Sequence, residues 1–120
     1  MVSDSQTPNR FAPMPDPPYY AVIFTNQLAT PAPGYDAMAD LVLALAQSQP
    51  GFLGAESTRD EAGLGITVSY WKDERAISAW KAEAQHLLAQ KLGITRWYAR
   101  YNLRVAKVER AYDGPQGREV

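Results

Sequence analysis

The chain has 120 residues, of which 46% are hydrophobic and 21% charged, and its net charge is −1, as expected for one small globular domain. A charge so close to zero argues against non-specific binding of nucleic acid, which requires a basic surface. The lack of cysteine excludes disulfides and thiolate metal sites, and the single histidine excludes a poly-histidine metal site within one chain.

Residues 1–18 contain five of the nine prolines and few apolar residues, so we expect a loose Pro-rich tail, laid across a partner in one interpretation. The segment lacks a PxxP repeat with basic flanks, which argues against a ligand of a proline-recognition module. No apolar run is long enough to cross a bilayer, and no signal pattern is present, so we expect a cytoplasmic protein without membrane contact.

The first strand is predicted over Tyr19 to Leu28, which is rich in aromatic and β-branched residues. Its two faces are both largely apolar, which favours a strand covered on both sides. One face carries Tyr20, Val22, Phe24 and Asn26, and the other carries Ala21, Ile23 and Thr25.

A helix is predicted over Tyr35 to Gln49, because Met38, Leu41, Val42 and Leu45 form one apolar stripe at helical spacing. Two strands follow at Phe52 to Arg59 and Leu64 to Trp71. The turn at Asp60 to Gly63 makes them antiparallel. In the second strand Ile66, Val68 and Tyr70 share one face, and Thr67, Ser69 and Trp71 share the other.

Asp73 is the expected N-cap of the second helix, which should end between Lys91 and Thr95 with Gly93 as its C-terminal residue. The apolar stripe of this helix is Ile77, Trp80, Ala84, Leu87 and Leu88. The last strand is predicted over Trp97 to Tyr112, followed by a polar tail at residues 113–120. On this strand Tyr101, Leu103 and Val105 alternate with Arg100, Asn102 and Arg104.

The predicted order is therefore strand, helix, strand, strand, helix, strand. Two right-handed crossovers turn this order into an α+β, ferredoxin-like antiparallel sheet with both helices on one face. The first and last strands are apolar on both sides, so the second sheet face also needs a cover. A symmetric second copy of the chain is the simplest one, which predicts a homodimer.

The segments QPGFLGAESTRD, GITVSYW, AISAWKAEAQH and RWYARY-LRVAKVERAY resemble the antibiotic biosynthesis monooxygenase (ABM) domain family, of the dimeric α/β-barrel superfamily. The resemblance covers Tyr19 to Tyr112 and implies a homodimer whose sheets pack face to face. It also implies a pocket in each subunit between the sheet and the helices. The superfamily includes cofactor-free oxygenases of polycyclic phenols, haem-degrading enzymes and proteins without a known reaction.

His86 is the only side chain that titrates near neutral pH without perturbation, which makes it a candidate catalytic base. On a straight helix it lies nearly opposite the apolar stripe and faces solvent. The resemblance implies a helix break just before this residue, which would turn His86 toward the pocket. The sequence between Glu83 and Gln85 holds no Gly or Pro that forces such a break, so a surface His remains an alternative.

Asn26 ends the first strand in an Asn-x-Leu context, where the resemblance implies an asparagine that orients a substrate carbonyl or phenol. An edge residue that satisfies a loop is the alternative. Trp80 matches the family's helix tryptophan, which is either core or a pocket wall. The other pocket residues that we predict are Tyr70, Trp97, Tyr101, Phe24 and, for an anionic ligand, Arg59.

Three functions stay open. The first is cofactor-independent oxygenation of a small electron-rich aromatic, with His86 as base and Asn26 as orienting group. The second is haem binding or degradation through His86; the resemblance places the axial histidine ten residues after the helix Trp, where this chain has Gln90, a poor haem ligand. The third is a non-catalytic dimer whose pocket is filled by Trp80 and its neighbours. No cofactor is predicted apart from haem in the second function, and no separate metal site is predicted in any of them.

Overall fold

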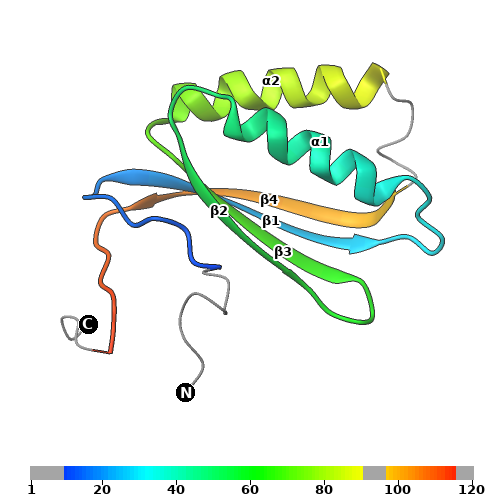
Figure 1. The fold of residues 1–120 in the computed structure, drawn as a ribbon, viewed down its shortest axis with the longest axis horizontal. Coiled ribbons are helices and arrows are strands. Elements are labelled where there is room, and N and C mark those ends of the chain that lie inside the picture. The colour runs from blue at the N-terminus through cyan, green and yellow to red at the C-terminus, as the bar shows by residue number, and fades with distance from the viewer. Residues whose placement is uncertain (1–9, 91–96, 116–120) are drawn as a thin grey trace.

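The computed structural model describes residues 10–90 and 97–115, which form one layer of strands and one layer of helices (Figure 1). The elements follow one another as predicted, which confirms the α+β, ferredoxin-like fold. They are β1 (Tyr19–Leu28), α1 (Tyr35–Gln47), β2 (Phe52–Arg59), β3 (Leu64–Trp71), α2 (Glu74–Gln90) and β4 (Tyr98–Val108).

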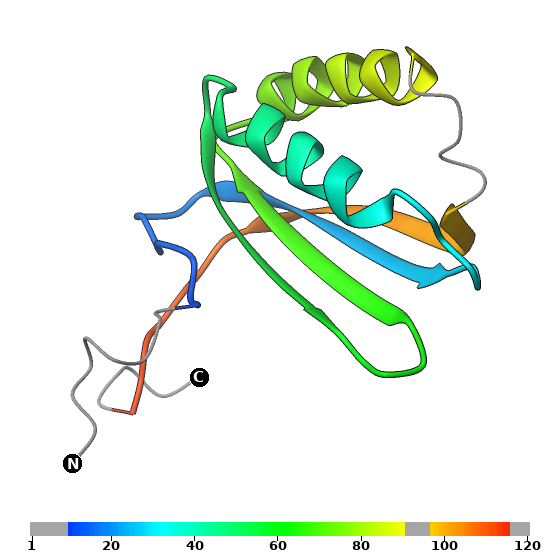
Figure 2. The ribbon, with the colours of Figure 1, turned by 45° about the vertical axis from the view of Figure 1, so that its right-hand side comes forward.

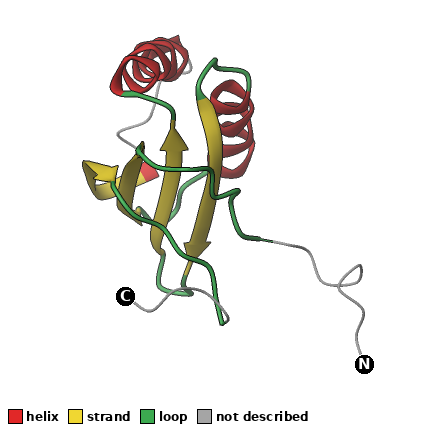
Figure 3. Cartoon of the chain, turned by 90° about the vertical axis from the view of Figure 1, so that its left-hand side faces the viewer, coloured by secondary structure: helices red, strands yellow, loops and turns green. Residues whose placement is uncertain are grey.

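The four strands form one antiparallel sheet in the order β2-β3-β1-β4, with β1 and β3 in the centre. Each helix connects a central strand to an edge strand, so both crossovers run over the same side of the sheet. Figure 2 shows the two helices on that side, and Figure 3 shows them side by side. We call this side of the sheet the helix face and the other the open face.

The strand register assigns every side chain of the sheet to one of these faces, because paired residues of antiparallel strands point to the same side. Tyr20 pairs with Trp71, and Val22 pairs with Ser69 on one neighbour and Val105 on the other. These residues lie on the helix face. Tyr70 pairs with Ala21 and so lies on the open face. The alternation predicted for β1 and β3 is confirmed.

The hydrophobic core lies between the helix face and the two helices. Val22, Ala46, Trp71 and Ile77 form its buried centre, and Trp71 has no exposed surface. The ring of Trp80 lies 5.2 Å from that of Trp71. The Trp80 indole N–H is buried and donates to no residue that the structure describes, which carries a cost in free energy.

Part of the open face is covered by the chain itself. The backbone N–H of Ala12 donates to one oxygen of Glu56 at 2.9 Å, and the Tyr70 hydroxyl donates to the other at 2.8 Å. Gly54 makes room for this segment, because a Cβ there would lie 2.8 Å from the ring of Pro13. The N-terminal residues described here therefore lie on β2 of their own sheet.

The far end of the open face has no such cover among the described residues. Leu64 is 45% exposed and Ile66 is 40% exposed, whereas Tyr19 and Ala21 at the near end are buried. The described part of the chain contains no helix of the length and apolar character that crossing a bilayer requires.

Three element ends differ from prediction: the end of α1 and both ends of β4, which begins at Tyr98 and not at Trp97. The first helix ends at Gln47 rather than Gln49, since the Ser48 hydroxyl donates to the Leu45 carbonyl. The last strand is shorter than expected and ends at Val108. The N-cap role of Asp73 is confirmed by its 2.8 Å bond from the Ala76 N–H. The helix end predicted at Lys91 to Thr95, with Gly93, lies outside the described residues, as does the Leu88 side chain.

The Tyr70–Glu56 contact makes stability sensitive to alkaline pH. Burial, and then the hydrogen bond to Glu56, raise the pKa of Tyr70 from 10.0 to about 12. The unfolded chain releases this proton first, so the free energy of unfolding falls as pH rises from 10 through 12. Tyr70→Phe should flatten that fall, and Glu56→Gln should flatten it in part. Urea unfolding across this pH range checks both, and a wild-type slope in Tyr70→Phe would contradict the contact.

Candidate functional site

The candidate site contains a set of hydrogen-bonded polar groups on the helix face, which we call the polar set. The Arg59 Nη2 donates to Asn26 Oδ1 at 2.7 Å and to the Tyr35 hydroxyl at 2.9 Å, while its Nη1 donates to the Gly63 carbonyl at 2.6 Å. Asn26 is only 2% exposed. The guanidinium also lies 5.3 Å from the centre of the Tyr35 ring, a cation–π distance.

This set exists because β3 carries a glycine at the crossing point. Gly65 pairs with Arg59 on one side and with Asn26 on the other, so it separates the two residues in the sheet. A Cβ at Gly65 would lie 2.5–2.7 Å from three guanidinium atoms. The Arg59 side chain therefore reaches across β3 only because that position has no side chain.

An aromatic cluster surrounds the polar set. Its rings meet mostly edge to face, which is a favoured geometry. Tyr98 is the hub, with centroid distances of 5.3 Å to Phe24, 5.7 Å to Tyr35 and 6.0 Å to Tyr101. Trp97 lies 6.4 Å from Tyr35 and donates its indole N–H to the Pro33 carbonyl at 2.9 Å. The cluster thus joins α1, β1 and β4.

The electrostatics of the cluster favour neutral phenols. Burial raises the pKa of the Tyr98 phenol above its ordinary value, and the neighbouring Tyr35 raises it further, while the charge of Arg59 lowers it. Tyr98 therefore stays protonated at neutral pH. The guanidinium remains the one fixed charge among the groups named here.

An exposed apolar strip continues from the cluster along β4. Tyr101 is 52% exposed, Leu103 44% and Val105 52%, although all three lie on the helix face. Tyr101 pairs directly with Asn26, and Leu103 pairs with Phe24. We call these three residues the β4 strip. It offers an apolar surface for a flat ring beside the buried amide.

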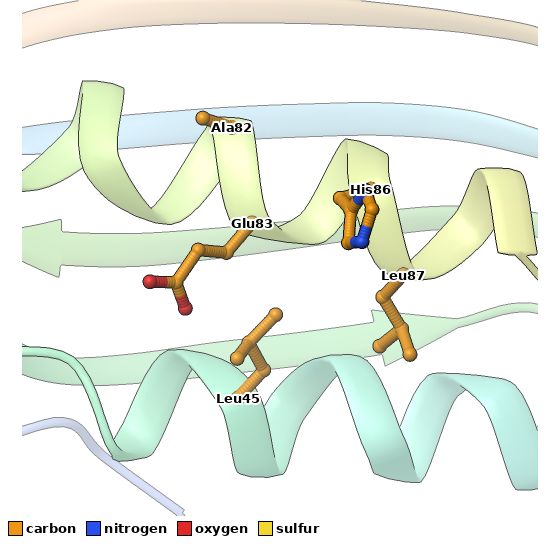
Figure 4. Close-up of a pocket in the computed structure, with 5 residues that line it drawn as sticks. All are labelled: Leu45, Ala82, Glu83, His86 and Leu87. Carbon is orange, nitrogen blue, oxygen red and sulfur yellow. The ribbon is translucent and has the colours of Figure 1, made fainter.

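His86 does not lie with these residues. The second helix is continuous from Glu74 to Gln90, so the predicted break is wrong; the residues between Glu83 and Gln85 are all compatible with a helix. His86 is exposed and lines a shallow groove of about 430 Å³ between the two helices (Figure 4). The groove is lined by Leu45, Ala82, Glu83, His86 and Leu87. Asn26 is not among its residues.

Two of the predicted pocket residues also lie elsewhere. Tyr70 is on the open face, because its neighbour Trp71 occupies the helix face, so its placement beside Trp80 is wrong. Trp80 packs in the core against Trp71. The predicted residues that do come together are Asn26, Arg59, Phe24, Trp97 and Tyr101.

Two members of the site were not predicted from the sequence. Tyr35 opens α1 directly after Gly34, and its side chain turns to Arg59; no local pattern signals that contact. Tyr98 follows Trp97, and its role depends on the pairing of β4 with β1. Within the described residues, no group of three His, Cys, Asp or Glu side chains is arranged to hold a metal ion.

Comparisons with known proteins show the family to which this fold belongs. The family model of antibiotic biosynthesis monooxygenase matches residues 24–92. The chain belongs to this family. An uncharacterized protein of Bacillus subtilis (strain 168), YqjZ, is 48% identical over 96 residues, which cover 80% of this chain and 84% of the relative.

Solved structures of the family fold extend the comparison. SnoaB, a cofactor-independent oxygenase from Streptomyces nogalater, superposes with a TM-score of 0.66 at 11% identity, over 79% of this chain and 97% of that one. Rv0793 from Mycobacterium tuberculosis superposes with a TM-score of 0.60 at 13% identity, over 81% and 99%. Identities this low establish the shared fold.

Because Arg59 crosses β3 at Gly65, the effect of Gly65→Ala on the free energy of unfolding should depend on whether Arg59 is present. Gly65→Ala should destabilise the wild type by about 1–3 kcal/mol, since Arg59 must leave the buried Asn26 and its other two partners. In an Arg59→Ala background the same change should be neutral or stabilising by about 0.5–1 kcal/mol, since strand alanine is favoured over glycine and the three nearest atoms to the new Cβ, all of Arg59, are gone. Urea unfolding of the four proteins measures the cycle. Equal costs in both backgrounds would refute the contact.

Proposed function

We propose that this ABM-family chain oxygenates a small electron-rich aromatic, of the phenol, quinol or anthrone type, without flavin, haem or metal. The observation that carries the proposal is the buried Asn26 amide, held by Arg59, beside the exposed apolar β4 strip. An aromatic ring on the strip would place its oxygen substituent near the amide. The cofactor-independent oxygenase SnoaB shares the fold, which supports the proposal.

The reaction needs no external reductant. In an anthrone-type substrate, ionisation gives an electron-rich anion that passes an electron to O₂. The CH₂ group then becomes C=O, and the second oxygen atom leaves as water with the two hydrogens. The protein would contribute a ring-binding surface with little water and a donor for the ring oxygen. The described residues place His86 outside this site, so it has no part in the proposal.

Oxygen uptake tests the reaction. The wild type should consume O₂ with an anthrone or quinol substrate, and Asn26→Leu should lower kcat/KM by roughly 10²–10³-fold, as loss of one positioned donor does. His86→Ala should match the wild type, and a loss there would show that the histidine takes part. No uptake by the wild type across a panel of such substrates would favour a non-catalytic binding protein instead.

We also propose that two copies pair through the open face. Leu64 and Ile66 are exposed there without a cover among the described residues, and burying them would stabilise a pair. Family membership supports this arrangement.

Sedimentation checks the pairing. Ile66→Glu should shift the chain toward monomer, because a charge would then be buried in the interface. Leu43→Glu, on the exposed side of α1, is the matched control and should sediment as the wild type does. A wild type that sediments as a monomer at micromolar concentration would contradict the proposal.

A further inference from the structure

The hydrogen bonds of Arg59 fix which end of the Asn26 amide is available. A guanidinium has donors and no acceptor, so the Asn26 atom that faces it at 2.7 Å must be the oxygen. The amide NH₂ is therefore turned away from Arg59. It makes no hydrogen bond with any residue that the structure describes. Asn26 thus turns its two N–H donors, and not its oxygen, toward a ligand.

The charge of Arg59 is also left without an opposite charge. Its three hydrogen-bond acceptors are an amide oxygen, a backbone carbonyl and a phenol, all neutral, and its fourth contact is the face of the Tyr35 ring. No carboxylate pairs with it in residues 10–90 and 97–115. A half-buried cation with neutral partners raises the local potential, because fewer water molecules screen it.

We propose that the Asn26 NH₂ group binds an oxyanion, a phenolate or enolate oxygen, and that Arg59 is the positioning residue that orients the amide and supplies the stabilising charge. The inference rests on the proposed function, since it concerns the same site and names the ionised form of the substrate. Arg59 acts through Asn26, whose oxygen stands between the guanidinium and the ligand. The proton of the phenol or enol passes to solvent, so the site needs no histidine as base.

Two features of the site agree with an oxyanion. The Asn26 oxygen is turned to Arg59, so the amide presents its NH₂ donors to a ligand, and an ionised oxygen accepts such bonds more strongly than a neutral hydroxyl does. The space over Gly65 also keeps the guanidinium close to the amide, and the bond to the Gly63 carbonyl holds it from the far side. The direction of the amide is therefore set by Arg59, which the Gly63 carbonyl and the space at Gly65 hold in place, and not by the ligand.

The test measures ionisation and not turnover. 4-Nitrophenol and the larger 4-nitro-1-naphthol absorb visible light only as phenolates, so a pH titration of each protein-bound probe reports its pKa directly. A positive charge nearby should lower the pKa of the bound probe by roughly 1–3 pH units in the wild type. Arg59→Met should abolish that decrease, and so should Gly65→Ala, which keeps every charge but displaces the guanidinium.

The controls separate position from charge and from folding. Arg104→Met removes an exposed arginine whose side chain lies on the open face, because Arg104 pairs with Ile23, and it should keep the wild-type decrease. Arg59→Lys retains a positive charge but cannot bridge Asn26 and Tyr35 as the guanidinium does. It should therefore show only part of the wild-type decrease in the pKa of the bound probe. Circular dichroism and urea midpoints confirm that the variants compared are folded.

The outcomes distinguish this inference from the proposed function. A wild-type decrease that persists in folded Arg59→Met overturns the inference, and so does failure of the wild type to bind either probe. A decrease that is lost in Arg59→Met and Gly65→Ala supports it, even if the wild type consumes no O₂ with any substrate, a result that would overturn only the oxygenase proposal. If the wild type consumes O₂ but the decrease in the probe pKa does not depend on Arg59, only the inference would be overturned.

Discussion

The candidate site depends on one side chain that crosses a strand. Arg59 starts on the edge strand β2 and reaches Asn26 on β1 by passing over Gly65. The crossing converts three separate elements into one polar unit, since the same nitrogen also holds Tyr35 at the start of α1. Around that unit the partly buried rings of Phe24 and Tyr98 reduce its contact with water, which strengthens the effect of the single charge. Without the glycine, the arginine would be one more surface cation.

The two faces of the sheet have different roles, and the strand register alone separates them. The helix face carries the core at one end, around Trp71, and the polar unit at the other. The open face carries Tyr70 and Glu56, which hold the N-terminal segment, and then the exposed pair Leu64 and Ile66. A shift of one residue in β3 would exchange these two sets and would remove both the core and the site.

The sequence predicted the element order and the strand alternation, because these follow from local spacing and residue chemistry. The family resemblance singled out Asn26, and residue chemistry suggested Arg59 for an anionic ligand. The hydrogen bond between the two was not predicted, because it depends on the pairing of β3 with both β1 and β2. It did not predict which of Tyr70 and Trp71 faces the helices, since that depends on the pairing of β3 with β1, which local patterns do not contain. The expected break before His86 came from the family resemblance, and the chain has no residue there to produce it. Tyr35 was missed because its importance arises only from its distance to Arg59.

The described ends of the chain lie on the same side of the sheet. The segments near residues 10 and 115 both lie beyond the open face, away from α1 and α2 (Figure 1). A fluorescent protein joined directly at residue 10 or residue 115 would therefore lie on the side of the sheet through which we propose that two copies pair, and away from Arg59 on the helix face. Immobilisation through a cysteine introduced on the outer side of α2 would leave the open face clear, which makes it the better attachment point for biosensor work.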